Sequence, residues 1–255
     1  MPRRISLALS GGGMRGAAHI GVVKRLEELN ISIAVVSGTS VGALVGALLA
    51  DGYSAIDLEK IFIESKFSFD FNFLNFRSGL FSSKKLEELL RKNLRAKKIS
   101  ELKTSFFACA TSYETGKPRY FDEGDLLPIL LASSAIPLAY ETVNIQNNVY
   151  VDGGLSRNLP TEPLLMFPYP IIGVHVNPID SQSNKKNFTQ KFDHLVHLSL
   201  KEKLNHAEKD CAVFIEPESL LDYSIFETNH LKEMIAIGYQ KATAVLTEER
   251  INMLF

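Results

Sequence analysis

The stretch from residue 33 to residue 50 constrains the fold more than any other part of this chain. It reads I-A-V-V-S-G-T-S-V-G-A-L-V-G-A-L-L-A: a β-branched apolar run stops at Ser37, the pattern G-x-S-x-G follows as Gly38, Ser40 and Gly42, and a helix-forming run begins at once. A sharp strand-to-helix turn needs glycine on both sides of its apex, because Cβ atoms there would crowd an exposed nucleophile. The pattern predicts a strand, a turn and a helix with Ser40 as a candidate nucleophile. The alternative interpretation is a small-residue turn before a buried helix, in which the glycines only permit close packing.

A second glycine-rich turn lies near the start of the chain. An apolar strand over residues 5–9 leads into S-G-G-G-M-R-G, and apolar residues at helical spacing follow from Ala17. Unpaired backbone N–H groups at the start of a helix favour negative charge. The turn is therefore a candidate anion-binding loop.

Three kinds of site compete for this loop. Gly11, Gly13 and Gly16 match the dinucleotide pattern G-x-G-x-x-G, but that site requires an acidic residue about 20 residues further on, where this chain has S-G-T-S. A P-loop is excluded because no Lys-Ser or Lys-Thr pair follows the glycines. An oxyanion hole, in which N–H donors stabilise the charge that forms when a serine attacks an acyl carbonyl, remains as the functional interpretation. The alternative is a tight loop with no ligand.

A third motif places a carboxylate at the end of a strand. Residues 149–151 form an apolar strand that runs into Asp152, Gly153 and Gly154. Open α/β sheets place their chemistry at the carboxyl ends of strands, so Asp152 and Ser40 are expected at equivalent positions. Strand and helix patterns alternate through much of the chain, which predicts a largely parallel sheet covered on both faces.

Composition limits the class of protein. The chain has 255 residues, is 45% hydrophobic and carries a formal net charge of −1, which predicts one large domain over residues 1–255 and gives no case for nucleic-acid binding. No apolar run is long enough for a membrane span or a signal sequence, so a cytoplasmic protein is expected. Cys109 and Cys211 lie in apolar runs and are expected to be buried thiols. No metal-ligand spacing is visible, and no metal or cofactor is expected.

Phenylalanine is concentrated between residues 62 and 81. This stretch holds seven of the 16 phenylalanines, and those from Phe67 to Phe73 alternate with polar residues, which indicates an extended segment with one apolar face. Such a segment lines an acyl-chain groove, meets a lipid surface or packs on the core. Residues 83–98 follow as an amphipathic helix with a basic outer face.

Taken together, S-G-G-G-M-R-G, G-T-S-V-G-A-L and D-G-G resemble the patatin-like phospholipase family, and residues 132–137 resemble its further A-S-x-x-x-P block. The resemblance covers Ile5 through Gly154; the motif-bearing part is residues 5–160, and residues 161–255 match only in general terms. It implies a three-layer α/β/α sandwich with a mostly parallel central sheet, and a Ser-Asp dyad that hydrolyses acyl esters of lipids. By matching motif, Ser40 is the nucleophile and Asp152 the base. The resemblance assigns the oxyanion hole to Gly11, Gly12 and Gly13, and it implies that Arg15 braces the loop. The remaining motif glycines are Gly16, Gly38, Gly42, Gly153 and Gly154.

Other assignments stay open at this point. A Ser-Asp-His triad in α/β-hydrolase order is available through His175, His194, His197 or His206, although only about two strands precede Ser40 here and that class normally places several before its nucleophile. Transfer of the acyl group to an alcohol uses the same residues, and a non-catalytic lipid-binding regulator is a third possibility. The expected partner is a lipid or other fatty-acyl ester, with transient contact to a membrane surface and no nucleic acid.

Overall fold

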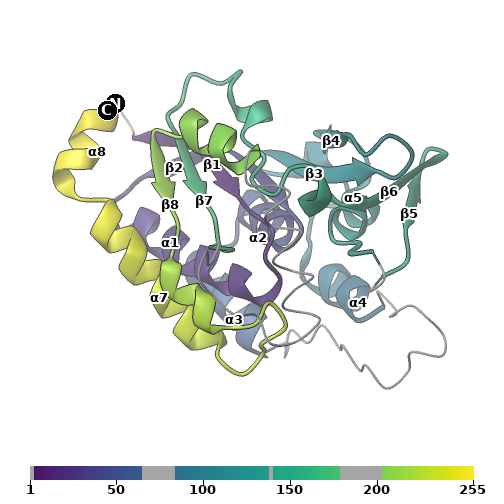
Figure 1. Ribbon diagram of the computed structural model, residues 1–255, viewed down its shortest axis with the longest axis horizontal. Helices are drawn as coiled ribbons and strands as arrows, with labels where there is room; N and C mark the ends of the chain where they lie inside the picture. Colours follow the sequence, from purple (N-terminus) through teal and green to yellow (C-terminus); the bar gives the residue numbers. More distant parts are fainter. Residues whose placement is uncertain (1–2, 65–83, 138–139, 179–202) are drawn as a thin grey trace.

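A computed structural model describes residues 3–64, 84–137, 140–178 and 203–255 (Figure 1). Within them, eight strands form one sheet in the order β5-β6-β3-β2-β1-β7-β8, with β4 added on β3. The strands are β1 (Arg4–Leu9), β2 (Ser32–Thr39), β3 (Ser105–Ser112), β4 (Pro118–Phe121), β5 (Val143–Ile145), β6 (Asn148–Asp152), β7 (Ile171–Val174) and β8 (Val213–Ile215).

The strands β3, β2, β1, β7 and β8 are parallel and form the covered half of the sheet. Every residue of β1 from Ile5 to Leu9 is buried, as expected for a parallel strand covered on both faces. Alternate residues face two separate clusters: Leu7 and Val36 belong to the larger core, and Ala8 and Val35 to the smaller one. The sheet is therefore the middle layer of the fold, as the sequence predicts.

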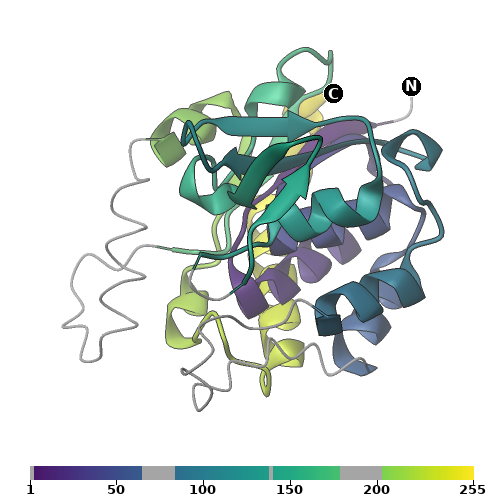
Figure 2. The ribbon, with the colours of Figure 1, turned by 90° about the vertical axis from the view of Figure 1, so that its right-hand side faces the viewer.

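Helices form the larger cover. They are α1 (Ala17–Glu28), α2 (Val41–Ala50), α3 (Ala55–Glu64), α4 (Lys84–Asn93), α5 (Leu126–Ser133), α7 (Leu231–Val245) and α8 (Glu248–Leu254). The helices α1 and α7 pack along each other, and Figure 2 shows the purple and blue helices on one side of the strands. On the other face, the smaller cluster is closed by Leu159, Leu164 and Ala207, of which Leu164 ends the short helix η5 (Glu162–Leu164).

The strand β3 joins the parallel half to an antiparallel half. Cys109 pairs with both Thr39 of β2 and Tyr120 of β4, and the next residue, Ala110, pairs with Arg119 of β4 and with Asp152 of β6. Because β4 occupies one edge of β3 at both positions, β2 and β6 follow one another along the other edge. These two strands run toward each other and end next to each other, Thr39 beside Cys109 and Asp152 beside Ala110.

Several details differ from the sequence-based expectations. The sequence pattern over residues 231–249 predicts one helix, but the structure breaks it after Val245 into α7 and α8, where Thr247 caps α8 through the N–H of Arg250. The helix expected over residues 83–98 ends at Asn93, because the carboxylate of Asp51 accepts the next free amides, beginning with that of Arg95 at 2.7 Å. Cys109 is a buried free thiol, whereas Cys211 is only half-buried. Of the Phe-rich stretch, Phe62 is buried at the end of α3, and most of the remainder lies outside the described residues.

Candidate active site

The predicted strand-turn-helix unit is present as β2, Ser40 and α2. Ser40 has φ 53° and ψ −125°, a conformation that L-residues rarely adopt and that strains the backbone at the apex of the turn. A Cβ atom on Gly38 would clash with the carbonyl oxygen of Gly42, and one on Gly42 would clash with that of Leu9. Glycine is therefore required at both positions by the close approach of β1, β2 and α2.

Ser133, at the end of α5, holds the turn in place. Its hydroxyl donates to the carbonyl of Cys109 at 2.6 Å and accepts the backbone N–H of Ser40 at 3.0 Å. Since this N–H is occupied, it is not one of the donors available to a bound anion. Ser133 lies in the A-S-x-x-x-P block that the sequence singles out, but sequence reasoning gave it no role, because nothing local indicates which strand α5 packs against.

Asp152 ends β6 beside this turn. The side chain of Ser40 lies near enough to its carboxylate to lower the pKa of Asp152, and the N–H of Gly154 donates to Asp152 Oδ1 at 2.7 Å. Asp152 is 6% exposed and Ser40 is 5% exposed. Burial raises the pKa of Asp152 from 3.8 to about 6, and the hydrogen bonds from Ser40 and Gly154 oppose part of that rise. The structure thus places a serine hydroxyl beside a carboxylate whose proton affinity is increased.

The location of Asp152 corrects one step of the sequence argument. Asp152 and Ser40 were expected at equivalent carboxyl ends of parallel strands, but β6 runs antiparallel to β3. The two residues meet because β2 and β6 approach each other end to end along β3.

The glycine loop is fixed by hydrogen bonds to the backbone N–H and the backbone carbonyl of Gly11. Its N–H donates to the carbonyl of Asn158 at 3.1 Å, and its carbonyl accepts from Asn177 Nδ2 at 2.9 Å and from Ser10 Oγ at 3.0 Å. In the trans peptide between Gly11 and Gly12, the N–H of Gly12 points opposite to the carbonyl of Gly11 and therefore away from Asn177 and Ser10. Within the described part of the chain, the N–H groups of Gly12 and Gly13 have no acceptor, whereas that of Gly11 is occupied.

Arg15 braces the loop from behind. Its Nη2 and Nε donate to the carbonyl of Tyr223 at 2.6 and 2.9 Å, and its Nη1 lies 3.4 Å from Asn177 Oδ1. The guanidinium is buried, with 7% of the residue exposed. It therefore ties the glycine loop to the ends of two other segments, one after β7 and one after the short helix η6 (Glu218–Asp222).

The histidines do not form a triad with Ser40 in the described structure. The two ring nitrogens of His175 contact Glu216 and Asn158 at 2.7 and 3.3 Å, which leaves neither for Ser40. His206 is exposed, and His194 and His197 lie outside the described residues. The buried ring of His19 bonds the carbonyl of Ser10 at 2.9 Å, and burial lowers its pKa to about 4.

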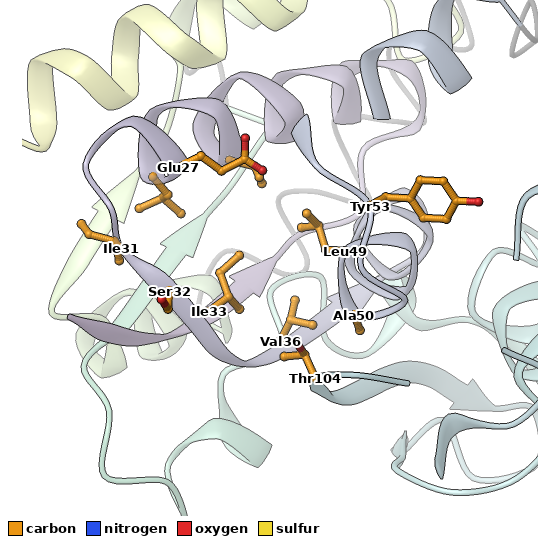
Figure 3. A pocket seen from close by; sticks show the side chains of 11 residues that line it. Glu27, Ile31, Ser32, Ile33, Val36, Leu49, Ala50, Tyr53 and Thr104 are labelled. Carbon is orange, nitrogen blue, oxygen red and sulfur yellow. The ribbon is translucent and has the colours of Figure 1, made fainter. Parts of the chain in front are cut away.

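A cavity of about 250 Å³ lies at the other end of the sheet (Figure 3). It is lined by Ser32 and Ile33 at the start of β2 and by Glu27, Leu49 and Tyr53 around them. Of the lining residues on β2, Val36 is nearest to Ser40 along the strand, and the four-residue step between these positions spans about 13 Å. The cavity is not part of the candidate site.

Fold and site together define an α/β protein with a serine at a strained strand-to-helix turn, and with a buried carboxylate and a glycine loop beside it. The model of the patatin-like phospholipase family matches residues 7–165, more than half of the chain, and the chain belongs to this family. In the described residues, no helix is long and apolar enough to cross a membrane.

Relatives with similar sequences include two named proteins. An uncharacterized NTE family protein of Mycobacterium tuberculosis is 30% identical over 167 residues, which cover 63% of this chain and 45% of that protein. The lysophospholipase nte1 of Aspergillus fumigatus is 26% identical over 192 residues, 71% of this chain and 12% of that protein. The chain therefore spans less than half the length of these relatives.

The crystal structure of VipD from Legionella pneumophila has the same fold. It superposes with a TM-score of 0.58 at 14% identity and covers 99% of this chain and 67% of that one. This likeness extends over nearly the whole chain, including the part after residue 165 that the family model does not match.

Proposed function

We propose that the chain is a serine lipid acyl hydrolase that cleaves carboxylic esters of fatty acids with Ser40 as nucleophile and Asp152 as base. The observation that carries this proposal is the strand register, which places Ser40 beside a buried carboxylate whose pKa is raised to about 6. Membership of the patatin-like phospholipase family supports a lipid ester as the substrate.

The first half of the reaction forms an acyl-enzyme. Asp152 accepts the proton of Ser40 as Oγ attacks the ester carbonyl, and the lipid alcohol leaves with that proton. A carboxylate is a weak base toward a hydroxyl, and the raised proton affinity of Asp152 reduces this mismatch. The N–H groups of Gly12 and Gly13 are the proposed oxyanion donors, since those of Gly11 and Ser40 are occupied by Asn158 and Ser133.

The second half regenerates the enzyme. Water attacks the acyl carbon and gives a proton to Asp152, and this proton passes to Ser40 Oγ as the bond from Oγ to the acyl carbon breaks and the fatty acid leaves. Each step uses only side chains and backbone groups of this chain.

The test is hydrolysis of a soluble fatty-acyl ester together with labelling by a fluorophosphonate, which reacts with activated serines. Ser40→Ala and Asp152→Asn should each abolish hydrolysis, and Ser40→Ala should abolish labelling. Ser112→Ala, at the last residue of β3, is the matched serine control and should retain both. Hydrolysis at the wild-type rate by Ser40→Ala would refute the proposal.

The same experiment separates the alternatives from the sequence. Labelling of Ser40 without free fatty acid, but with an acylated alcohol as product, identifies an acyltransferase. Absence of both labelling and turnover in the wild-type chain identifies a non-catalytic lipid-binding protein.

A further inference from the structure

Asn158 borders the candidate site without belonging to any of its three motifs. A methyl group added to Gly11 would lie 2.7 Å from Asn158 Oδ1 and 3.3 Å from Ser40 Cβ. One added to Gly154 would lie 3.0 Å from Asp152 Oδ1 and 3.5 Å from Asn158 Oδ1. The amide oxygen of Asn158 therefore lies against the glycine loop on one side and against the Asp152 loop on the other.

His175 determines which end of this amide faces the site. His175 Nδ1 lies 2.7 Å from Glu216 Oε1, and Asn158 Nδ2 lies 3.3 Å from His175 Nε2. The tautomer that satisfies both contacts has Nδ1–H donating to Glu216 and Nε2 accepting from the Asn158 NH₂ group. The amide oxygen is consequently turned toward Gly11 and Gly154.

The fold fixes this arrangement from two adjacent strands. His175 directly follows β7 and Glu216 directly follows β8, whose last residues, Val174 and Ile215, are paired. The side chain of His175 is only 3% exposed, and its ring stacks on Phe214. The backbone N–H of His175 donates to the carbonyl of Ile215 at 2.9 Å. A buried ring restrained in this way holds its hydrogen-bond partner in a single orientation.

We propose that Glu216, His175 and Asn158 form a support chain that positions the reacting groups, with Asn158 as the positioning residue. Asn158 connects the two loops that carry the site: its carbonyl accepts the N–H of Gly11, and its side-chain oxygen lies beside Gly154, whose N–H binds Asp152. Misplacing such loops by about 1 Å lowers turnover by up to about a hundredfold without removing any reacting group. The inference rests on the proposed function of Ser40 and Asp152.

The experiment is a double-mutant cycle on hydrolysis of a soluble fatty-acyl ester. Asn158→Ala leaves the backbone bond to Gly11 in place and removes only the amide, and His175→Phe keeps the ring volume and the stacking on Phe214. Each should lower kcat by about tenfold or more with KM changed by less than about twofold. In the Asn158→Ala background, His175→Phe should have no further effect on kcat, because both act through one chain.

Matched variants separate positioning from a general loss of structure. His175→Gln keeps one acceptor and one donor and should restore most of the kcat that His175→Phe loses. His206→Phe changes an exposed histidine in the same way and is the control for the substitution itself. If His175→Phe does not fold, Glu216→Leu replaces it, because Glu216 is the partly exposed end of the support chain. The same changes in kcat and KM are expected for this variant.

The following results decide between these possibilities. If His175→Phe lowers kcat by the same factor in the wild-type and the Asn158→Ala backgrounds, the support chain is refuted. Wild-type kcat in both single variants would refute it as well. Ser40→Ala is measured in parallel: its inactivity beside a fully active Asn158→Ala refutes the support chain alone, whereas activity in Ser40→Ala refutes the proposed dyad.

Discussion

Replacing Asp152 by Asn should change the stability of the protein by an amount that becomes more favourable as the pH rises from acidic to neutral. Burial raises the pKa of Asp152 from 3.8 to about 6, so the native state holds this proton more tightly than the unfolded chain does. Stability therefore falls as the pH rises from about 4 to about 6 and is constant above that range. The amide that Asp152→Asn introduces has no proton to lose, and the variant does not suffer this decline.

The magnitude follows from the shift. One pKa unit corresponds to about 1.4 kcal/mol, so ionising the buried carboxylate costs about 3 kcal/mol at pH values well above 6. About 2 kcal/mol of this change falls between pH 4.5 and pH 7.5. The difference in free energy of unfolding between Asp152→Asn and wild type should therefore increase by about 2 kcal/mol over that interval, whatever constant offset the new amide introduces.

Urea unfolding of both proteins at pH 4.5, 5.5, 6.5 and 7.5 measures this difference. Subtracting the two proteins cancels every other titrating group that the substitution leaves unchanged. Asp122→Asn, at an exposed aspartate, is the matched control for the change from carboxylate to amide. A difference that is the same at all four pH values within about 0.5 kcal/mol would refute the reasoning, because Asp152 would then have an ordinary pKa and no increased proton affinity.

Three further predictions follow from the same site. Because Asp152 must be ionised to act as base, kcat/KM for a soluble ester should fall about tenfold per pH unit below about pH 6, and a profile flat to pH 5 would contradict this assignment. The strained backbone of Ser40 favours glycine, so the free energy of unfolding measured in urea should be about 1 kcal/mol higher for Ser40→Gly than for Ser40→Ala. Equal free energies would show that the turn is relaxed. Ser133→Ala removes the acceptor for the Ser40 N–H and should lower kcat about tenfold. The control is Ser134→Ala: Ser134 is a buried neighbour whose hydroxyl has no partner among the described residues, so this substitution should change kcat little.

The elements around the nucleophile were predictable because each carries a local signal. The apolar run before Ser37 became β2, the small residues after Ser40 became α2, and the helical spacing after residue 16 became α1. The glycines of G-x-S-x-G were also interpretable, since the clash that a Cβ atom would cause follows from the sharpness of the turn. These features depend on neighbours within a few residues.

The support of the site was not predictable in this way. Ser133, Asn158 and Glu216 act on groups far away in the sequence: Ser133 on the N–H of Ser40, Asn158 on Gly11, and Glu216 on His175. A single serine, asparagine or glutamate gives no periodic signal, and its partner is fixed only once the strands are ordered in the sheet. The one local hint was that Asn158 lies a few residues after the D-G-G motif and directly before a buried apolar segment.

The direction of β6 was the decisive unknown, because alternation along a strand is the same whether its neighbour runs parallel or antiparallel. With β6 antiparallel, Asp152 reaches Ser40 only because the last residue of β2 and the last residue of β6 pair with adjacent residues of β3, Cys109 and Ala110. This register leaves little tolerance. A slip of β6 by one residue would turn Asp152 to the opposite face of the sheet, and a slip by two would move it by about 7 Å along β3. The approach of Ser40 and Asp152 therefore depends on the pairing of three strands that are well separated along the chain.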